Sequence, residues 1–395
     1  MSGDYKGSIA DLDNAANYDP NNYDIYLTRG LSKKGSDDLI GAIVDFNRAI
    51  SINSSSSYAY TQRGTTKYFR DDFKGAISDF DIALSFNPSD ELAYSFRGIA
   101  KIKSDYFNET NLRSAILDLD RAILLDSSAS GQSMAYDNRG LAEIYLNEFD
   151  KSMTDLNKAI SLNSQNADAY YNRGYLNELN SKKDDAMKDF DEAIRINPNY
   201  AIAYSRRGVI KTQMRNFTSG MADLNRAIAL SPYDPYLYAN RGWAKTVQTM
   251  QDFSGALDDY NNAVKYGPNN AEFYGSRGYV KGKLKDYNGS INDFDSALAI
   301  DPKNEYSLNS RGIAKDYGLK DYVGAIKDFD AVIEINPKYD GYYINRGISE
   351  FKLGRMESAR ADFEKSQELN SNNIGFDDWA TAIKENRVYA EIPRP

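Results

Sequence analysis

Small and aromatic side chains recur three and four positions apart along most of this chain. In one instance Ala76 is followed by Phe80 and Ala83, and an earlier stretch places Tyr60 four residues before Gly64. Residues at these spacings lie on one face of an α-helix, so each stretch predicts an amphipathic helix. The pattern therefore predicts helix pairs. The first helix carries the tyrosine and glycine, and the second carries the alanines and an aromatic or leucine residue.

An Arg-Gly pair in each first helix sets the period of this pattern. The arginines are Arg29, Arg63, Arg97, Arg139, Arg173, Arg207, Arg241, Arg277, Arg311 and Arg346. Six of the nine successive spacings are 34 residues, and the other three are 35, 36 and 42. Many second helices are followed by a proline, which cannot continue a helix: Pro20, Pro88, Pro198, Pro232, Pro268, Pro302 and Pro337. A fixed period of this length indicates a repeat protein.

The residues at these positions resemble the tetratricopeptide repeat family. Its motif has an aromatic residue, a glycine, an alanine, an aromatic residue, an alanine and a proline at this spacing. The resemblance covers residues 5–370. It implies an all-α fold, a right-handed superhelical solenoid of antiparallel helix pairs with a concave groove. The residues also predict stacking independently, because one such pair cannot bury its apolar face alone.

We expect three segments in the chain. Residues 1–22 hold a half-repeat with a second helix only, residues 23–371 hold ten tandem repeats, and residues 372–395 form a capping helix and tail. Trp379 and Ile383 share one helical face of the predicted cap. The leading second helix has no first helix before it. This indicates either a chain cut from a longer protein or an apolar face that meets another chain.

The glycine of each first helix has a predicted packing role. Glycine costs about 1 kcal/mol of helix propensity, and close packing must recover that cost. We expect Gly64 to let its helix approach the second helix closely at Ala76. The other second helices also have a small residue at this position.

The arginines depart from the family pattern, which usually has leucine there. Each is matched by an aspartate one residue before the aromatic or leucine of the second helix. The pairs include Arg63 with Asp79, Arg173 with Asp189, and Arg207 with Asp223. Because the aspartates match the arginines one for one, we predict a ladder of partly buried pairs that specify register. The alternative is that the arginines face the groove and bind acidic ligands.

Candidate partner-binding residues lie beside the Arg-Gly pairs, since the family's groove is lined by first helices. Asn138, Asn172, Asn240 and Asn345 directly precede an arginine and resemble an asparagine ladder that tracks an extended peptide backbone. The alternative is that asparagine is only a common exposed residue here.

Aromatic side chains form the second group of candidates. Tyr175, Trp243 and Tyr279 directly follow a glycine, and Tyr171 is close by. Exposed aromatic anchors are typical of interaction hot spots. The alternative is packing against the neighbouring repeat. Trp243 and Tyr175 are the best candidates for binding.

Composition excludes several kinds of chemistry. The net charge is −9 at pH 7, which makes nucleic acid a poor partner. No run of 18 apolar residues is present, so we expect no membrane insertion. The chain has no cysteine and no histidine, which removes disulfides, thiolate zinc sites and His-based acid/base catalysis. Asp-x-Asp pairs such as Asp79 and Asp81 point in different directions on a helix. We therefore expect no enzyme, no cofactor and no metal.

The expected function is a non-catalytic scaffold or adaptor that binds a partner protein or extended peptide in the groove. The alternatives are self-association as a structural building block, and the recognition arm of a larger enzyme. The family's two-carboxylate clamp is missing, because the positions for its lysine hold Thr61, Ser95 or Asp137. Without a signal peptide the default location is cytoplasmic, unless an upstream export signal is missing from this chain.

Overall fold

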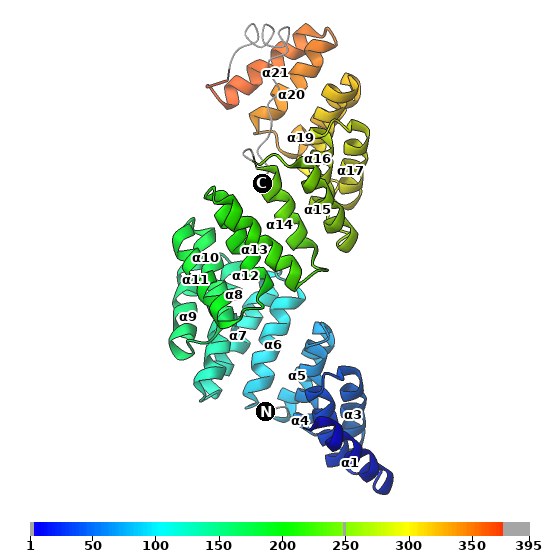
Figure 1. The fold of residues 1–395 in the computed structure, drawn as a ribbon, viewed down its shortest axis with the longest axis vertical. Helices are drawn as coiled ribbons and strands as arrows, with labels where there is room; N and C mark the ends of the chain where they lie inside the picture. The colour runs from blue at the N-terminus through cyan, green and yellow to red at the C-terminus, as the bar shows by residue number, and fades with distance from the viewer. Residues whose placement is uncertain (1–3, 248–249, 374–395) are drawn as a thin grey trace. The chain divides into compact units, whose positions relative to one another are not determined.

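The computed structural model describes residues 4–247 and 250–373 of the 395-residue chain. The described residues form twenty-one α-helices and one π-helix, and none of them lies in a strand (Figure 1). The chain divides into two compact parts, Met1–Asn199 and Tyr200–Pro395, here called the N-terminal and C-terminal parts. The prediction of an all-α solenoid of helix pairs is confirmed.

The N-terminal part begins with the single helix α1 (Tyr5–Tyr18) and continues with five helix pairs. The pairs are α2 (Tyr23–Gly35) with α3 (Leu39–Ile52), α4 (Ser57–Tyr68) with α5 (Phe73–Phe86), α6 (Glu91–Ser104) with α7 (Glu109–Leu125), α8 (Ala129–Tyr145) with α9 (Phe149–Leu162), and α10 (Ala167–Leu179) with α11 (Lys183–Ile196). Each first helix packs mainly against its own second helix, and the second helices α3, α5, α7 and α9 each pack against the next first helix.

The C-terminal part contains five further pairs. They are α12 (Ala201–Gln213) with α13 (Phe217–Leu230), α14 (Pro235–Thr246) with α15 (Phe253–Tyr266), α16 (Ala271–Lys283) with α17 (Tyr287–Ile300), α18 (Glu305–Ile313) with α19 (Tyr322–Ile335), and α20 (Asp340–Lys352) with α21 (Met356–Leu369). A π-helix, η1 (Ala314–Leu319), follows α18 directly. The predicted capping residues Trp379 and Ile383 lie outside the described residues.

The aromatic or leucine residue of each second helix lies against the glycine of its own first helix. Phe80 is fully buried, and a Cβ atom on Gly64 would come within 2.8 Å of its ring. A Cβ on Gly98 would likewise lie 2.9 Å from Leu119 Cγ. Glycine is therefore required for close approach, as predicted. The nearest side chain, however, is the aromatic residue and not Ala76, which was expected there.

The π-helix accommodates one extra residue between a first and a second helix. Arg311 and Asp328 are 17 residues apart, whereas Arg63 and Asp79 are 16 apart. A π-turn holds one more residue than an α-turn. Arg311 consequently still reaches Asp328, with Nη2 2.6 Å from Oδ1.

Candidate functional site

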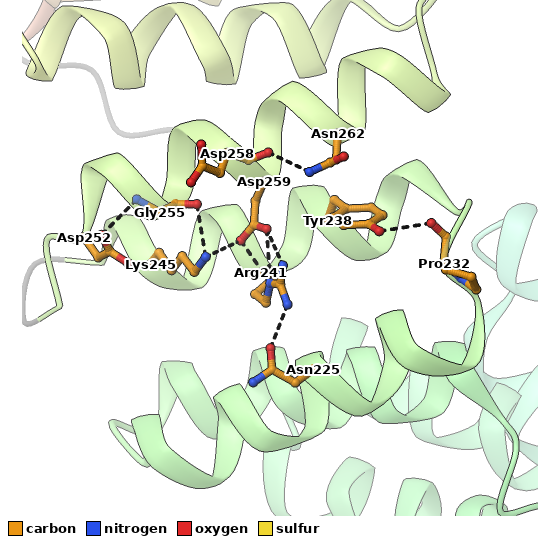
Figure 2. Close-up of polar contacts among 10 residues, drawn as sticks. All are labelled: Asn225, Pro232, Tyr238, Arg241, Lys245, Asp252, Gly255, Asp258, Asp259 and Asn262. Carbon is orange, nitrogen blue, oxygen red and sulfur yellow. Dashed lines mark hydrogen bonds and ion pairs between the residues drawn. The ribbon is translucent and has the colours of Figure 1, made fainter.

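A cluster of polar side chains joins three successive helices around the arginine of a repeat, and Figure 2 shows one example with four members, Arg241, Asp259, Asn225 and Lys245. Arg241 on α14 donates from Nη2 to Asp259 Oδ1 on α15 at 2.6 Å and from Nε to the same carboxylate. Its Nη1 donates to Asn225 Oδ1 on α13, in the preceding repeat, at 2.8 Å. Lys245 Nζ lies 2.8 Å from Asp259 Oδ2. The arginine thus joins its own pair and the repeat before it.

The arginine–aspartate contact recurs in all ten described repeats. Their closest contacts are 2.5–2.7 Å, in pairs Arg29–Asp45, Arg63–Asp79, Arg97–Asp118, Arg139–Asp155, Arg173–Asp189, Arg207–Asp223, Arg241–Asp259, Arg277–Asp293, Arg311–Asp328 and Arg346–Asp362. The predicted contacts are therefore present. Their role in specifying register remains a prediction.

The contact to the preceding repeat explains the Asp-x-Asp and Asp-x-Asn pairs. Asp79 accepts from Arg63 of its own repeat, whereas Asp81 accepts from Arg97 of the next. The equivalent acceptors elsewhere are Asp13, Asn47, Asp120, Asn157, Asn225, Asn261, Asp295 and Asp330. The two side chains of such a pair thus accept hydrogen bonds from two different arginines.

The ladder uses most hydrogen-bond donors of the arginines inside the protein. In Arg63, Nε and Nη2 donate to Asp79, Nη1 donates to Asn47, and the guanidinium lies 5.3 Å from the ring centre of Tyr60. Its side chain is 16% exposed and that of Asp79 is 2% exposed. This geometry favours the structural interpretation over the binding of acidic ligands by the arginines.

A lysine four residues after the arginine completes the cluster in seven repeats. These lysines contact the ladder aspartate at 2.7–2.8 Å: Lys33, Lys67, Lys101, Lys211, Lys245, Lys281 and Lys315. The other repeats have Glu143, Asn177 and Glu350 at this position. Sequence reasoning missed this lysine column, although its constant offset from the arginine was visible.

Glu143 is the exception with the largest electrostatic consequence. It is 5% exposed, and its Oε2 atom is buried without a hydrogen-bond partner. Burial, together with the nearby charge of Asp155, raises the pKa of Glu143 to about 8. Burial likewise raises the pKa of Asp137 on the same helix to about 8, although Asn172 donates a hydrogen bond to it. Helix α8 therefore carries two carboxyl groups that favour the neutral form.

The four predicted asparagines all donate hydrogen bonds inside the protein. Asn138 donates to the Met134 carbonyl on its own helix. The other three donate to a residue on the preceding first helix: Asn172 to Asp137, Asn240 to Ser205 and Asn345 to Asn309. One donor of each amide is thus engaged within the repeat array. Peptide binding by these residues remains a prediction.

The predicted aromatic residues are all half-buried. Tyr171 packs 5.8 Å from Phe190 between ring centres. Tyr175 packs against the cluster of Ile144, Leu156 and Leu176, of which the first two belong to the preceding repeat. Lys283 Nζ lies 5.2 Å from the ring centre of Tyr279. Trp243 on α14 is also partly exposed. Tyr171 and Tyr175 lie on α10 of the N-terminal part, whereas Trp243 and Tyr279 lie on α14 and α16 of the C-terminal part.

A second aromatic group, formed by Tyr68 at the end of α4, Phe69 directly after it and Phe96 on α6, was not predicted. Phe69 is 55% exposed, and its ring centre lies 6.0 Å from that of Phe96, which in turn lies 5.3 Å from Tyr68. Lys34 of α2 lies 5.8 Å from the centre of the Phe69 ring. Phe96 stands at the position where four other repeats have asparagine and the remaining five have another polar residue, and this was the signal available in the sequence.

Neither a metal site nor a membrane span is found in the described part of the chain. Among residues 4–247 and 250–373, no group of three acidic side chains is arranged to hold a metal ion. No helix of that range is both long and apolar enough to cross a membrane.

Comparison with known proteins identifies the repeats. Family profiles described as TPR repeat and tetratricopeptide repeat match residues 140–181, 167–200, 271–304 and 341–373. The predicted resemblance to this family is confirmed. No curated relative matches the chain at a significant level.

One of three similar solved structures supports the fold. A chain in the crystal structure of the APC/C hetero-tetramer Cut9–Hcn1 is similar over 82% of this chain and 63% of its own length, with a TM-score of 0.61 and 17% identity. Yeast Tom70 gives a TM-score of 0.46 with 14% identity, over 97% of this chain and 93% of Tom70. YrrB, described as a TPR protein with an unusual peptide-binding site, gives 0.41 with 19% identity, over 50% and 97%. At these identities the likeness concerns the fold alone.

Proposed function

We propose that this chain, which carries tetratricopeptide repeats at residues 140–200, 271–304 and 341–373, is a non-catalytic protein-interaction scaffold. The first helices would bind an extended peptide segment of a partner protein. The observation that carries the proposal is the partial exposure of Tyr175, Trp243 and Tyr279, which the ladder does not use. Large aromatic side chains at partly exposed positions are typical anchors of protein interfaces.

The ladder supports this function by holding the first helices in place. Nine of the arginines donate both to the buried aspartate of their own second helix and to a more exposed Asp or Asn on the preceding second helix, as Arg241 does with Asp259 and Asn225. We infer that these hydrogen bonds keep neighbouring first helices at a constant spacing. A surface held in position before binding loses less conformational entropy when a partner binds. Rigid repeats with partly exposed aromatic side chains therefore suit a scaffold.

A displayed library of random peptides tests the proposal. We expect the chain to select peptides whose affinity falls about tenfold or more when Trp243 or Tyr175 is replaced by alanine, the size typical of an anchor residue. Tyr18→Ala is the matched control, because Tyr18 is 90% exposed on α1. If the selected peptides bind both variants as tightly as wild type, the interface lies elsewhere on the chain. If the library yields no binding peptide, the proposed function is contradicted.

Self-association through α1 is the second candidate. Helix α1 carries the apolar residues Ile9 and Leu12, yet none of its described residues is fully buried. A second copy could cover this face. Under that alternative Ile9→Asp lowers the mass measured at high protein concentration, whereas under the scaffold function the chain is monomeric with or without the substitution.

A further inference from the structure

Lys34 is a partly buried lysine whose ammonium group contacts neutral groups and, among residues 4–247 and 250–373, no carboxylate. Its Nζ atom donates to Thr65 Oγ1 at 2.6 Å and to Gln62 Oε1 at 3.2 Å. The seven ladder lysines instead contact a buried aspartate, as Lys33 does with Asp45. Burial alone lowers the pKa of Lys34 to about 8, with no acidic group offsetting it. A partly buried cation without a counter-ion is costly to maintain.

An aromatic surface adjoins this lysine. Lys34 comes from α2, Phe69 directly follows the last residue of α4, and Phe96 comes from α6, so three successive repeats contribute. The exposed ring of Phe69 packs edge-on against Phe96. Lys103 Nζ lies 5.4 Å from the ring centre of Tyr68, and the negative charge of Asp71 favours the protonated form of this lysine.

We propose that the Phe69 surface, formed by Lys34, Phe69 and Phe96, binds a partner segment in which an acidic side chain adjoins a large apolar one. The carboxylate would contact Lys34 Nζ and supply the missing counter-ion, because charge-assisted hydrogen bonds are strong where water is partly excluded. The apolar side chain would cover the exposed ring of Phe69. The inference rests on the proposed scaffold function and specifies the chemistry of the partner.

Two observations favour an acidic peptide over other anions. The chain carries a net charge of −9, which repels a nucleic-acid strand with one charge per nucleotide more strongly than a peptide that brings a single carboxylate to Lys34. In addition, Lys34 is not one of the lysine positions of the family's two-carboxylate clamp, where this chain has Thr61, Ser95 or Asp137. The expected ligand is therefore an acidic side chain within a peptide and not a terminal carboxylate.

The test uses peptides selected by the whole chain from a displayed library, then synthesised with both ends blocked. The wild-type chain should enrich peptides in which Asp or Glu stands next to Phe, Trp or Leu. Lys34→Met and Phe69→Ser should each weaken the best such peptide about tenfold or more. Lys74→Met, on an exposed lysine of α5, is the matched control and should leave the affinity unchanged.

A double-mutant cycle and a titration make the test specific. Replacing the acidic residue of the peptide by its amide should weaken binding to the wild type but not to Lys34→Met. The pKa of Lys34, followed by NMR of its side chain, should rise when the blocked peptide is added. This readout does not depend on whether a variant folds less stably.

Other outcomes overturn the inference in distinguishable ways. Selected peptides that bind Lys34→Met as well as wild type but lose affinity for Trp243→Ala would refute this site and leave the scaffold function intact. Selection of no peptide would contradict both. Binding of a fluorescent poly(dT) oligonucleotide that disappears in Lys34→Met would show that the surface recognises phosphate instead.

Discussion

Replacing Glu143 by glutamine should change how stability depends on pH. In the folded chain the pKa of Glu143 is about 8, compared with an ordinary value of 4.5. The folded state therefore keeps a proton that the unfolded state loses as the pH rises through this range. Since the unfolded state binds fewer protons, the free energy of unfolding falls with rising pH.

The size of the effect follows from the pKa difference. One titrating group contributes up to about 1.4 kcal/mol per pH unit, so between about pH 4.5 and 7.5 Glu143 removes about 4 kcal/mol of stability. Asp137 acts in the same direction, because its pKa is also raised to about 8. Glu143→Gln leaves Asp137 as the remaining one of these two titrating groups on α8. It should therefore roughly halve the fall in unfolding free energy per pH unit that the two groups cause, and make the chain more stable than wild type near neutral pH.

The assay is urea unfolding followed by circular dichroism at several pH values, with hydrogen exchange of the α8 and α9 amides. Exchange is needed because repeat arrays unfold in segments, so a global transition can hide a local change. Glu364→Gln on α21 is the control, because Glu364 is exposed. An unchanged pH slope in Glu143→Gln would refute the reasoning, since it would mean that Glu143 is ionised in the folded chain.

Three further substitutions test the ladder and the packing by the same urea assay. Glu143→Lys restores the lysine found in seven repeats and should stabilise the chain by roughly 1–3 kcal/mol near neutral pH, because a buried charge gains a partner; a loss would show that this repeat cannot hold the lysine. Arg173→Ala should cost about 3–5 kcal/mol by leaving a buried carboxylate unpaired, whereas Arg113→Ala, on a 56% exposed side chain, should change nothing measurable. If Arg173→Ala melts like wild type, the ladder is not structural. Gly64→Ala should cost roughly 1–3 kcal/mol, because its Cβ atom would lie 2.8 Å from Phe80; equal stability would mean that the helices separate easily.

The fold and the ladder could be predicted from the sequence because both depend on constant offsets. The 16-residue separation of Arg63 and Asp79 recurs in most repeats, and one-for-one matching of opposite charges indicates contact. The bridge from Arg63 to Asn47 was not predicted, since it depends on how neighbouring repeats stack. The packing of Gly64 on Phe80 was assigned to Ala76 instead, because ring placement depends on side-chain conformation.

The candidate site was less predictable than the fold. The sequence identified the first-helix positions, but not that Asn172 and Asn345 would donate to the preceding first helix. It also favoured the aromatic residues of the middle repeats. The Phe69 surface is formed by side chains from three repeats, and each side chain stands at a different position within its repeat. Comparing one position across all the repeats therefore does not reveal it.

Sedimentation velocity with a labelled, selected peptide tests the central claim most directly. The chain would be measured over a wide concentration range, with the peptide at a fixed low concentration. A scaffold should sediment as a monomer of 44.4 kDa throughout, with the peptide moving at the same boundary. A mass that rises with protein concentration while the peptide stays unbound would contradict the claim and identify the chain as a self-assembling building block.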